Sequence, residues 1–303
     1  MLSLVVIRLV CVFFLLMIRR PPRSTQSRSS AASDVYKRQV STQVNPFYVA
    51  MADGVKEEAA RQGIEVYVLN ANDKLDKQIA DVEDLIQKKI QVLLINATHD
   101  GAVAVVEKAA KAGIPVITLQ REIPTSMVIS HIGTDNVVIG RMGAQWIVDK
   151  LGGKGNVVVM EGIPGADSSE SRKIGSAEVF KKNPGIKIVA QQSGQYDRAK
   201  AMNVMENILQ AQPKIDAVYC FNDEMAMGVL AAVKAAGRTG ILITGMDANQ
   251  DAVEAVKKGE LAMTIALPPK DIGRLGVIYA KWLKTGEISV PVKSIMPVQF
   301  ITP

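Results

Sequence analysis

Short apolar runs alternate with helical stretches along residues 40–303, and this alternation restricts the fold more than any other feature of the sequence. The runs are EVYVLN, VLLIN, PVITL, NVVVMEG, KIVAQQ, AVYCF and LITGMD. Between them, apolar residues recur at the helical period, with helices expected at 46–62, 77–88, 102–112, 137–151, 198–212, 224–236, 251–258 and 270–285. Strands that are apolar along most of their length are typical of parallel sheets covered on both faces, so the sequence predicts an α/β fold.

Residues 1–39 differ in charge from the rest of the chain. The whole sequence has 36 Lys+Arg and 30 Asp+Glu, a formal net charge of +6. Seven of these bases and one acid, Asp34, fall within residues 1–39, which leaves 29 bases and 29 acids for residues 40–303. The basic balance therefore lies outside the main body of the chain and gives no argument for a nucleic-acid partner.

Three interpretations of residues 1–39 compete. A secretory signal peptide has an unbroken apolar core after a basic start, but Arg8 interrupts the core here and most of the arginines follow it. A membrane anchor needs about 20 apolar residues, and the stretch 2–18 is shorter and contains Arg8. The stretch FLLMIRRPPRSTQSRSSAASDVYKRQ resembles a translated sequencing-adapter fragment. We favour this third interpretation, with a genuine leader as the alternative.

Polar side chains follow the ends of the expected strands. They are Ser41, Asn70, Asn96, Gln120, Arg121, Thr134, Asp135, Asn222, Asp223 and Asp247. Ligands of open parallel sheets bind beyond the carboxyl ends of the strands, so the set predicts one shared polar cleft. Each Asn or Asp alone could instead cap the next helix. Arg121 cannot cap a helix N-terminus, and its presence favours a binding site.

Eight motifs resemble those of ribose-type periplasmic sugar-binding proteins, in the same order along residues 40–303. They are STQVNPFYVAMADG, VLLINATHDGA, GIPVITLQRE, SHIGTDN, GIPGADSSESRKIG, YDRAKAMNVMENIL, FNDEMAMGVLAAVKAAG and GELAMTIALPPKDIG. The resemblance implies a type I periplasmic binding protein fold, in which two Rossmann-like lobes are joined by a three-stranded hinge. It implies lobes at 40–134 plus 268–296 and at 135–267 plus 297–303. The implied function is that of the solute receptor of an ATP-binding-cassette sugar importer.

The resemblance also bears on residues 1–39. In the family, the residues just before the STQVNPF motif form the central first strand of the N-terminal lobe. Here that position reads DVYKRQV, and charges in a central strand would be buried without partners. We therefore expect residues 1–39 to be a non-native or disordered leader, and the native signal peptide to be missing from this sequence.

The resemblance assigns sugar contacts residue by residue. Phe47 and Tyr48 from one lobe and Tyr196 from the other match the aromatic rings that enclose the sugar. The matching hydrogen-bonding residues are Asn45, Arg121, Arg172, Asn222 and Asp247, while Ser41, Asn96 and Thr134 support them and Ile163 lines the wall. Each assignment has an alternative: aromatic residues at a helix start can belong to the core, Arg172 can be a surface charge and Asp247 a helix cap.

Two positions depart from the family pattern of ribose binders. Gln120 stands where those proteins have an aspartate, and Leu267 stands where they have a glutamine. An unpaired sugar hydroxyl against Leu267 would cost about 1–3 kcal/mol. The departures argue against ribose and favour another pentose, a deoxy sugar or a sugar alcohol.

Catalytic and metal chemistry have little support. The chain has two histidines, His99 and His131, and two cysteines, Cys11 and Cys220, which makes a metal cluster or a disulfide framework improbable. No phosphate loop, dinucleotide fingerprint or nucleophile elbow is found, and we expect no catalytic residue, metal or cofactor.

The expected partners are a monosaccharide or sugar alcohol and the membrane permease of an importer. We expect a monomer that binds no nucleic acid and is periplasmic or lipid-anchored outside the cell. The alternative is the sugar-sensing domain of a lac-repressor-type regulator that has lost its DNA-binding headpiece.

Overall fold

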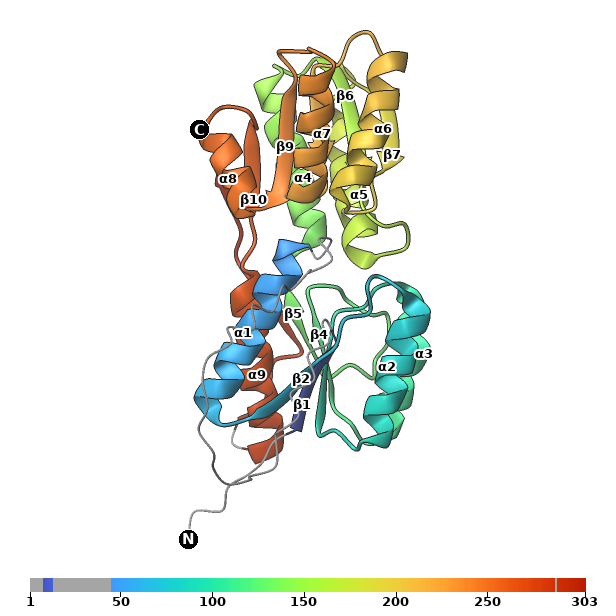
Figure 1. Ribbon diagram of the computed structural model, residues 1–303, viewed down its shortest axis with the longest axis vertical. Coiled ribbons are helices and arrows are strands. Elements are labelled where there is room, and N and C mark those ends of the chain that lie inside the picture. The colour runs from blue at the N-terminus through green and yellow to red at the C-terminus, as the bar shows by residue number, and fades with distance from the viewer. Residues whose placement is uncertain (1–7, 13–44, 287) are drawn as a thin grey trace, which may run out of the picture.

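The computed structural model describes residues 8–12, 45–286 and 288–303, which form two lobes, each with a six-stranded sheet (Figure 1). The first sheet has the order β11 (Lys293–Ile295), β5 (Ser130–Gly133), β4 (Val116–Leu119), β3 (Val92–Ile95), β1 (Arg8–Val12) and β2 (Glu65–Val68), with every pair parallel. The second has the order β12 (Gln299–Ile301), β10 (Met263–Ala266), β9 (Leu242–Asp247), β8 (Ala217–Cys220), β6 (Gly155–Glu161) and β7 (Ile186–Ser193). Only β12, which pairs with β10, runs antiparallel. The predicted α/β class is confirmed.

Helices cover both faces of each sheet. In the first lobe, α1 (Pro46–Gln62) packs with α9 (Pro269–Thr285) on one face, and α2 (Leu75–Gln87) with α3 (Val103–Lys111) and the short η1 (Asp100–Ala102) on the other. In the second lobe, α4 (Asn136–Lys150) packs with α5 (Asp167–Lys182), and α6 (Arg198–Ala211) with α7 (Asp223–Ala235), beside α8 (Gln250–Lys257). Because both faces are covered, every residue of β3, β4 and β8 is buried.

Helix α5 is absent from the helices expected from sequence periodicity. Its buried face is made of Ser168, Ser169, Arg172, Gly175, Ser176, Val179 and Phe180. An apolar stripe at helical spacing is the signal that sequence reading uses, and this face supplies it only in its last turn. The small side chains instead let α5 lie close against α4.

The chain passes between the two sheets three times. Thr134 and Asp135 join β5 to α4, Leu267 and Pro268 join β10 to α9, and residues 296–298 join β11 to β12. The Asp135 side chain accepts a hydrogen bond from the Val138 backbone N–H (2.9 Å), which caps α4 directly after the first crossing.

The central strand of the first lobe is formed by a different stretch from the one expected. Strand β1 pairs in parallel with β2 and β3. The sequence expectation placed this strand in DVYKRQV, which lies outside the described residues, and left residues 1–39 out of the fold. The structure differs from this expectation because residues Arg8–Val12, which were expected to lie outside the fold, form the central strand β1. A central parallel strand requires an apolar run, and Leu9 to Val12 supply one, whereas DVYKRQV does not.

Helix α1 is held against α9 by direct backbone contact. A Cβ atom added at Gly54 would lie 2.0 Å from the Lys270 carbonyl oxygen, and one at Gly273 would lie 2.1 Å from the Met51 carbonyl oxygen. No other residue type fits at either crossing point without moving a helix. The contact fixes the position of α1, whose first turn faces the other lobe. No helix among the described residues combines the length and apolar character needed to cross a membrane.

We expect Gly273→Ala to lower the free energy of unfolding by about 1–3 kcal/mol, because the added methyl group meets backbone that cannot move alone. Gly276→Ala, on the same helix, is the matched control: its Cβ would meet the ends of the Leu94 and Leu119 side chains at 3.2 Å. The gain in helix propensity should hold the control within about 1 kcal/mol of the parent. Urea unfolding measures both variants, and equal losses would contradict the backbone contact.

Candidate functional site

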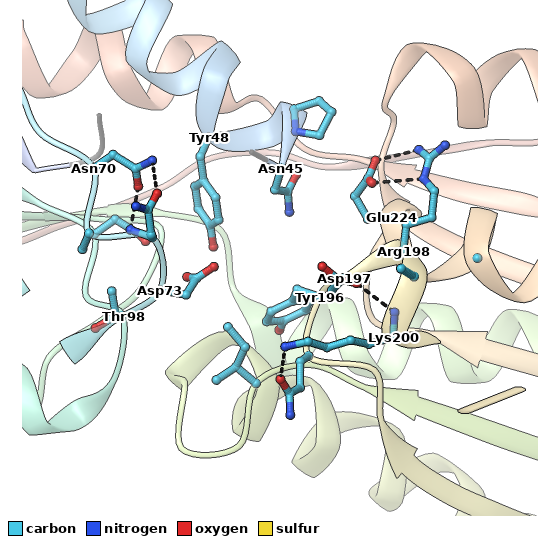
Figure 2. Close-up of a pocket in the computed structure, with 18 of the residues that line it drawn as sticks. Asn45, Tyr48, Asn70, Asp73, Thr98, Tyr196, Asp197, Arg198, Lys200 and Glu224 are labelled. Carbon is cyan, nitrogen blue, oxygen red and sulfur yellow. Dashed lines mark hydrogen bonds and ion pairs between the residues drawn. The ribbon is translucent and has the colours of Figure 1, made fainter. Parts of the chain in front are cut away.

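A polar cleft of about 1200 Å³ lies between the two lobes and is lined by both (Figure 2). The first lobe contributes residues that include Asn45, Tyr48, Asp73, Asn96, Thr98 and Arg121. The second lobe contributes residues that include Ile163, Tyr196, Arg198, Lys200 and Glu224. Seven residues predicted from the sequence line the cleft: Asn45, Tyr48, Asn70, Asn96, Arg121, Ile163 and Tyr196.

Arg121 is the most deeply buried charge of the cleft, with 1% of its surface exposed. Its Nη1 donates hydrogen bonds to the carbonyl oxygens of Ala97 (2.9 Å) and Thr98 (3.3 Å). The guanidinium carbon lies 5.5 Å from the ring centre of Tyr48 and 5.7 Å from that of Tyr196, within the range of cation–π attraction. Because the two rings belong to opposite lobes, Arg121 lies where the lobes meet.

The two tyrosines are placed by different local structures. Tyr48 lies in the first turn of α1, which begins at Pro46 and is capped by Asn45, whose side-chain oxygen accepts from the Phe47 N–H (2.9 Å). Tyr196 adopts a left-handed backbone conformation (φ 56°), and its hydroxyl lies 3.1 Å from the Ser168 hydroxyl. Figure 2 shows Tyr48 pointing into the cleft towards Asp73, with Tyr196 on the opposite side.

Gln120 and Thr134 lie behind Arg121 and are buried. Gln120 also has a left-handed backbone (φ 63°), which turns the chain directly after β4, and its Nε2 donates to the Thr134 hydroxyl (2.8 Å). The nearby Asn96 donates from Nδ2 to the Leu119 carbonyl (2.8 Å). These bonds fix the turn from which the Arg121 side chain extends.

Arg172 and Asn222 are buried in the second lobe, with 4% and 1% of their surfaces exposed. Arg172 donates from Nε to the Asn136 side chain (3.1 Å) and from Nη1 to the Phe221 carbonyl. This excludes the alternative that Arg172 is a surface charge. Asn222 caps α7, because its Oδ1 accepts from the Met225 N–H (3.0 Å), and its Nδ2 remains for another partner.

Asp247 ends β9 and is 8% exposed. Burial raises the pKa of its carboxyl to about 7, against the opposing effect of the positive charge of Arg172 and with a further rise from Glu224. The Asn45 side chain of the other lobe, acting as a hydrogen-bond donor, slightly lowers this pKa. Asp247 is not the cap of α8, since Asn249 occupies that position.

Not every predicted contact lines the cleft. The buried polar residues Gln120, Thr134, Arg172, Asn222 and Asp247 are not among its lining residues, and two further predicted contacts lie in the apolar core. Phe47 is 4% exposed and Leu267 is 6% exposed, and both pack within the main apolar cluster. Phe47 meets Tyr48 edge to face, with ring centres 5.3 Å apart, so it supports the ring that lines the cleft. For Phe47 the alternative, a core aromatic at a helix start, describes the structure better. Ser41 lies outside the described residues.

Sequence reasoning missed several charged residues of the cleft. Asp73 follows β2 in a loop with a left-handed backbone (φ 53°). Burial raises the pKa of the Tyr48 hydroxyl, and the charge of Asp73 raises it further. Across the cleft, Arg198 pairs with Glu224 (2.8 Å) and Asp251 (2.6 Å). These residues lie in a loop or at helix starts, and neither periodicity nor strand ends identify them.

Several buried polar side-chain atoms have no hydrogen-bond partner among the described residues, and two of them belong to Arg121, which lines the cleft. Seven such side-chain atoms occur in the part of the chain that the structure describes, and four belong to three residues of the site: Gln120 Oε1, Arg121 Nε and Nη2, and Asn222 Nδ2. Leaving a buried polar group unpaired costs about 1–3 kcal/mol. One acceptor and three donors can bind adjacent hydroxyl groups, which both donate and accept. No group of three potential metal-binding side chains occurs among these described residues.

Comparison with known proteins agrees with this architecture. The model of the periplasmic binding protein domain family matches residues 40–287. The chain is 39% identical over 260 residues to the ribose import binding protein RbsB of Bacillus subtilis, covering 84% of each chain. It is 38% identical over 263 residues to the D-allose-binding periplasmic protein of Escherichia coli, covering 83% of this chain and 85% of that one.

A solved structure with the same fold is that of an ATP-binding-cassette transporter solute binding protein from Bacillus halodurans with bound myo-inositol. The TM-score is 0.84 at 26% identity, over 98% of this chain and 94% of the other. The two-lobed fold, the matched residues 40–287 and the identity to these relatives show that this chain belongs to the periplasmic binding protein domain family.

Proposed function

We propose that the chain binds a monosaccharide or a sugar alcohol between its lobes and delivers it to the permease of an ATP-binding-cassette importer. The observation that carries this proposal is the cleft bounded by Tyr48 and Tyr196, in which Arg121 has two buried donors, Nε and Nη2, without hydrogen-bond partners in the described part of the chain. The hydroxyl groups of a sugar would pair with these atoms. A flat ring would cover the apolar C–H face of the same ligand at low entropic cost.

The charges of the site suit a neutral ligand. Arg121 on one lobe and Asp247 on the other are both buried, and each lowers the cost of burying the other. A charged ligand would leave one of them without compensation. Relatives named for ribose and D-allose and a solved structure with myo-inositol support a neutral polyhydroxylated ligand.

The lobes close over the ligand. The cleft of about 1200 Å³ is larger than the roughly 300–1,000 Å³ typical of small-molecule pockets. The residues proposed to bind belong to both lobes, and the lobes already meet in this structure, where the Glu122 N–H donates to the Asp167 carboxylate (3.3 Å). A ligand therefore enters while the lobes are apart and is enclosed when they return to this arrangement. The three crossings at residues 134–135, 267–268 and 296–298 would absorb the rotation. A permease could then distinguish loaded from empty protein by its shape.

A periplasmic or lipid-anchored monomer suits this role, and the relatives named for import and for the periplasm support the periplasmic location. Those names describe binding proteins, which supports a binding role without catalysis.

Tyr196→Ala should weaken binding about tenfold, because the loss of the ring removes stacking worth about 1–1.5 kcal/mol. Tyr196→Phe is the matched control, since it keeps the ring and loses only the hydroxyl near Ser168. Calorimetry with D-ribose, D-allose and myo-inositol measures both variants and ranks the ligands. Unchanged affinity in Tyr196→Ala would remove the ring from the site. If none of the three bound to the parent, the proposed ligand class would be wrong.

Saturating sugar should decrease the radius of gyration in small-angle X-ray scattering, because contacts from both lobes form together only after closure. At about ten times the parent's dissociation constant the parent is nearly saturated and Tyr196→Ala is about half occupied, so the radius of the variant should decrease by about half as much. A radius that stays constant while calorimetry records full occupancy would contradict the hinge mechanism.

Affinity should fall as the pH decreases below about 7, the pKa of Asp247 in the unliganded protein. The ionised carboxylate accepts hydrogen bonds from ligand hydroxyls, so binding favours the form present above pH 7. Protonation at lower pH competes with binding and can reduce affinity by up to about tenfold per pH unit. Asp247→Asn should bind more weakly with little dependence between pH 5.5 and 8. If the affinity of the parent stayed the same between pH 5.5 and 8, Asp247 would not accept a hydrogen bond from the ligand.

A further inference from the structure

The turn between β9 and α8 has an unusual backbone. Asp247 has φ 116° and the next residue, Ala248, has φ 57°, and neither is glycine. Such conformations cost of order 1–3 kcal/mol each and persist only where the surroundings enforce them. The turn sets the direction of the Asp247 side chain, so whatever holds the turn also determines where that carboxylate lies.

A buried carboxylate that the binding site does not use holds this turn. Asp223, the first residue of α7, has no exposed surface. Its Oδ2 accepts from the Asn249 backbone N–H (2.8 Å), and its Oδ1 accepts from the Thr264 hydroxyl (2.7 Å). The Thr264 oxygen in turn accepts from the Ala248 backbone N–H (3.3 Å). The N–H groups of the two residues after Asp247 are therefore both bound, one directly and one through Thr264.

The sheet leaves room for this carboxylate. A Cβ atom added at Gly245, on β9, would lie 2.1 Å from Asp223 Oδ1. Any larger residue at this position would displace the carboxylate from its bonds to the turn. Burial, together with the nearby charge of Asp247, raises the pKa of the Asp223 carboxyl. Helix α7, strand β10 and the turn are thus joined at one buried carboxylate.

We propose that Asp223 is a positioning residue for ligand binding: with Thr264 it clamps the turn at Ala248 and Asn249 and so directs the Asp247 carboxylate to the ligand. The inference rests on the proposed function, because it assigns a role to Asp223 through Asp247. Asp223 itself touches no ligand. Asparagine at position 223 keeps the size of the side chain but provides one acceptor oxygen in place of two, so the clamp loses one of its bonds.

A double-mutant cycle in the full chain tests the proposal, with the tightest binder among D-ribose, D-allose and myo-inositol as the probe. Asp223→Asn should weaken binding by roughly tenfold in the parent, and by less than about twofold when Asp247 is already Asn. If Asp223 only stabilised the fold, Asp223→Asn would weaken binding by the same factor in the parent and in the Asp247→Asn background. Equal losses, or no loss in the parent, would overturn the proposal.

Thr264 provides a matched pair of variants. Thr264→Val keeps the shape and removes the hydroxyl that links Asp223 to Ala248, so its affinity should fall as in Asp223→Asn. Thr264→Ser keeps the hydroxyl and should bind like the parent. Equal affinities of the Val and Ser variants would contradict the clamp.

Amide hydrogen exchange of the unliganded protein separates failure of the clamp from failure of the proposed function. The Ala248 and Asn249 amides should exchange slowly in the parent and at least about tenfold faster in Asp223→Asn and Thr264→Val. If the parent bound none of the three ligands, the proposed function would fail, and fast exchange in the variants would still support the clamp. If the Ala248 and Asn249 amides exchanged at the parental rate in both variants, the clamp would be overturned.

Discussion

The parallel pairing of the strands determines where every residue of the site lies. In a parallel sheet all carboxyl ends meet at one edge, and here that edge of each sheet faces the other lobe. Arg121 follows β4, Asn222 follows β8 and Asp247 ends β9, so residues far apart in the sequence come to the ends of the strands that face the other lobe. Three crossings between the lobes keep the two edges opposed. The topology of the sheets therefore sets the location of the site, and the side chains set its chemistry.

Arg121 shows how this site differs from an ordinary core. A buried guanidinium is costly unless it is paired, and Arg121 is held by two carbonyl oxygens and two aromatic rings, with Nε and Nη2 unpaired in the described structure. A sequence optimised for stability alone would pair or replace this charge. A ligand that supplies acceptors to those nitrogens recovers the lost hydrogen bonds, so binding and stability of the fold are linked.

The sequence predicts the fold class because continuous apolar runs and the 3.6-residue period report burial directly, and the prediction fails where the buried residues are not apolar. Helix α5 was missed because serine, glycine and arginine form most of its buried face. For the central strand the criterion of an apolar run was sound, but it was applied to DVYKRQV, and Leu9 to Val12 satisfy it instead. Adjacent residues on a helix point in different directions, so the sequence could not decide that Tyr48 lines the cleft and Phe47 the core. Asp73 and Lys200 reach the cleft only because the lobes are packed together, and no local pattern contains that information.

The turn after β9 joins the stability of the second lobe to the geometry of the site. Asp247 and Ala248 both have a positive φ angle, and the turn that they form brings two buried carboxyl groups together, those of Asp223 and Asp247. Each feature alone lowers stability. Burial raises the pKa of both carboxyl groups, and the charge of Asp247 raises the pKa of Asp223 further. An ordinary polar cap at the start of α8 would connect the strand to the helix without strain, yet Asn249 forms no side-chain capping bond. The fold therefore does not require this arrangement. What the arrangement achieves is a buried carboxylate with a fixed direction, close to Asn45 of the opposite lobe, which itself lines the cleft.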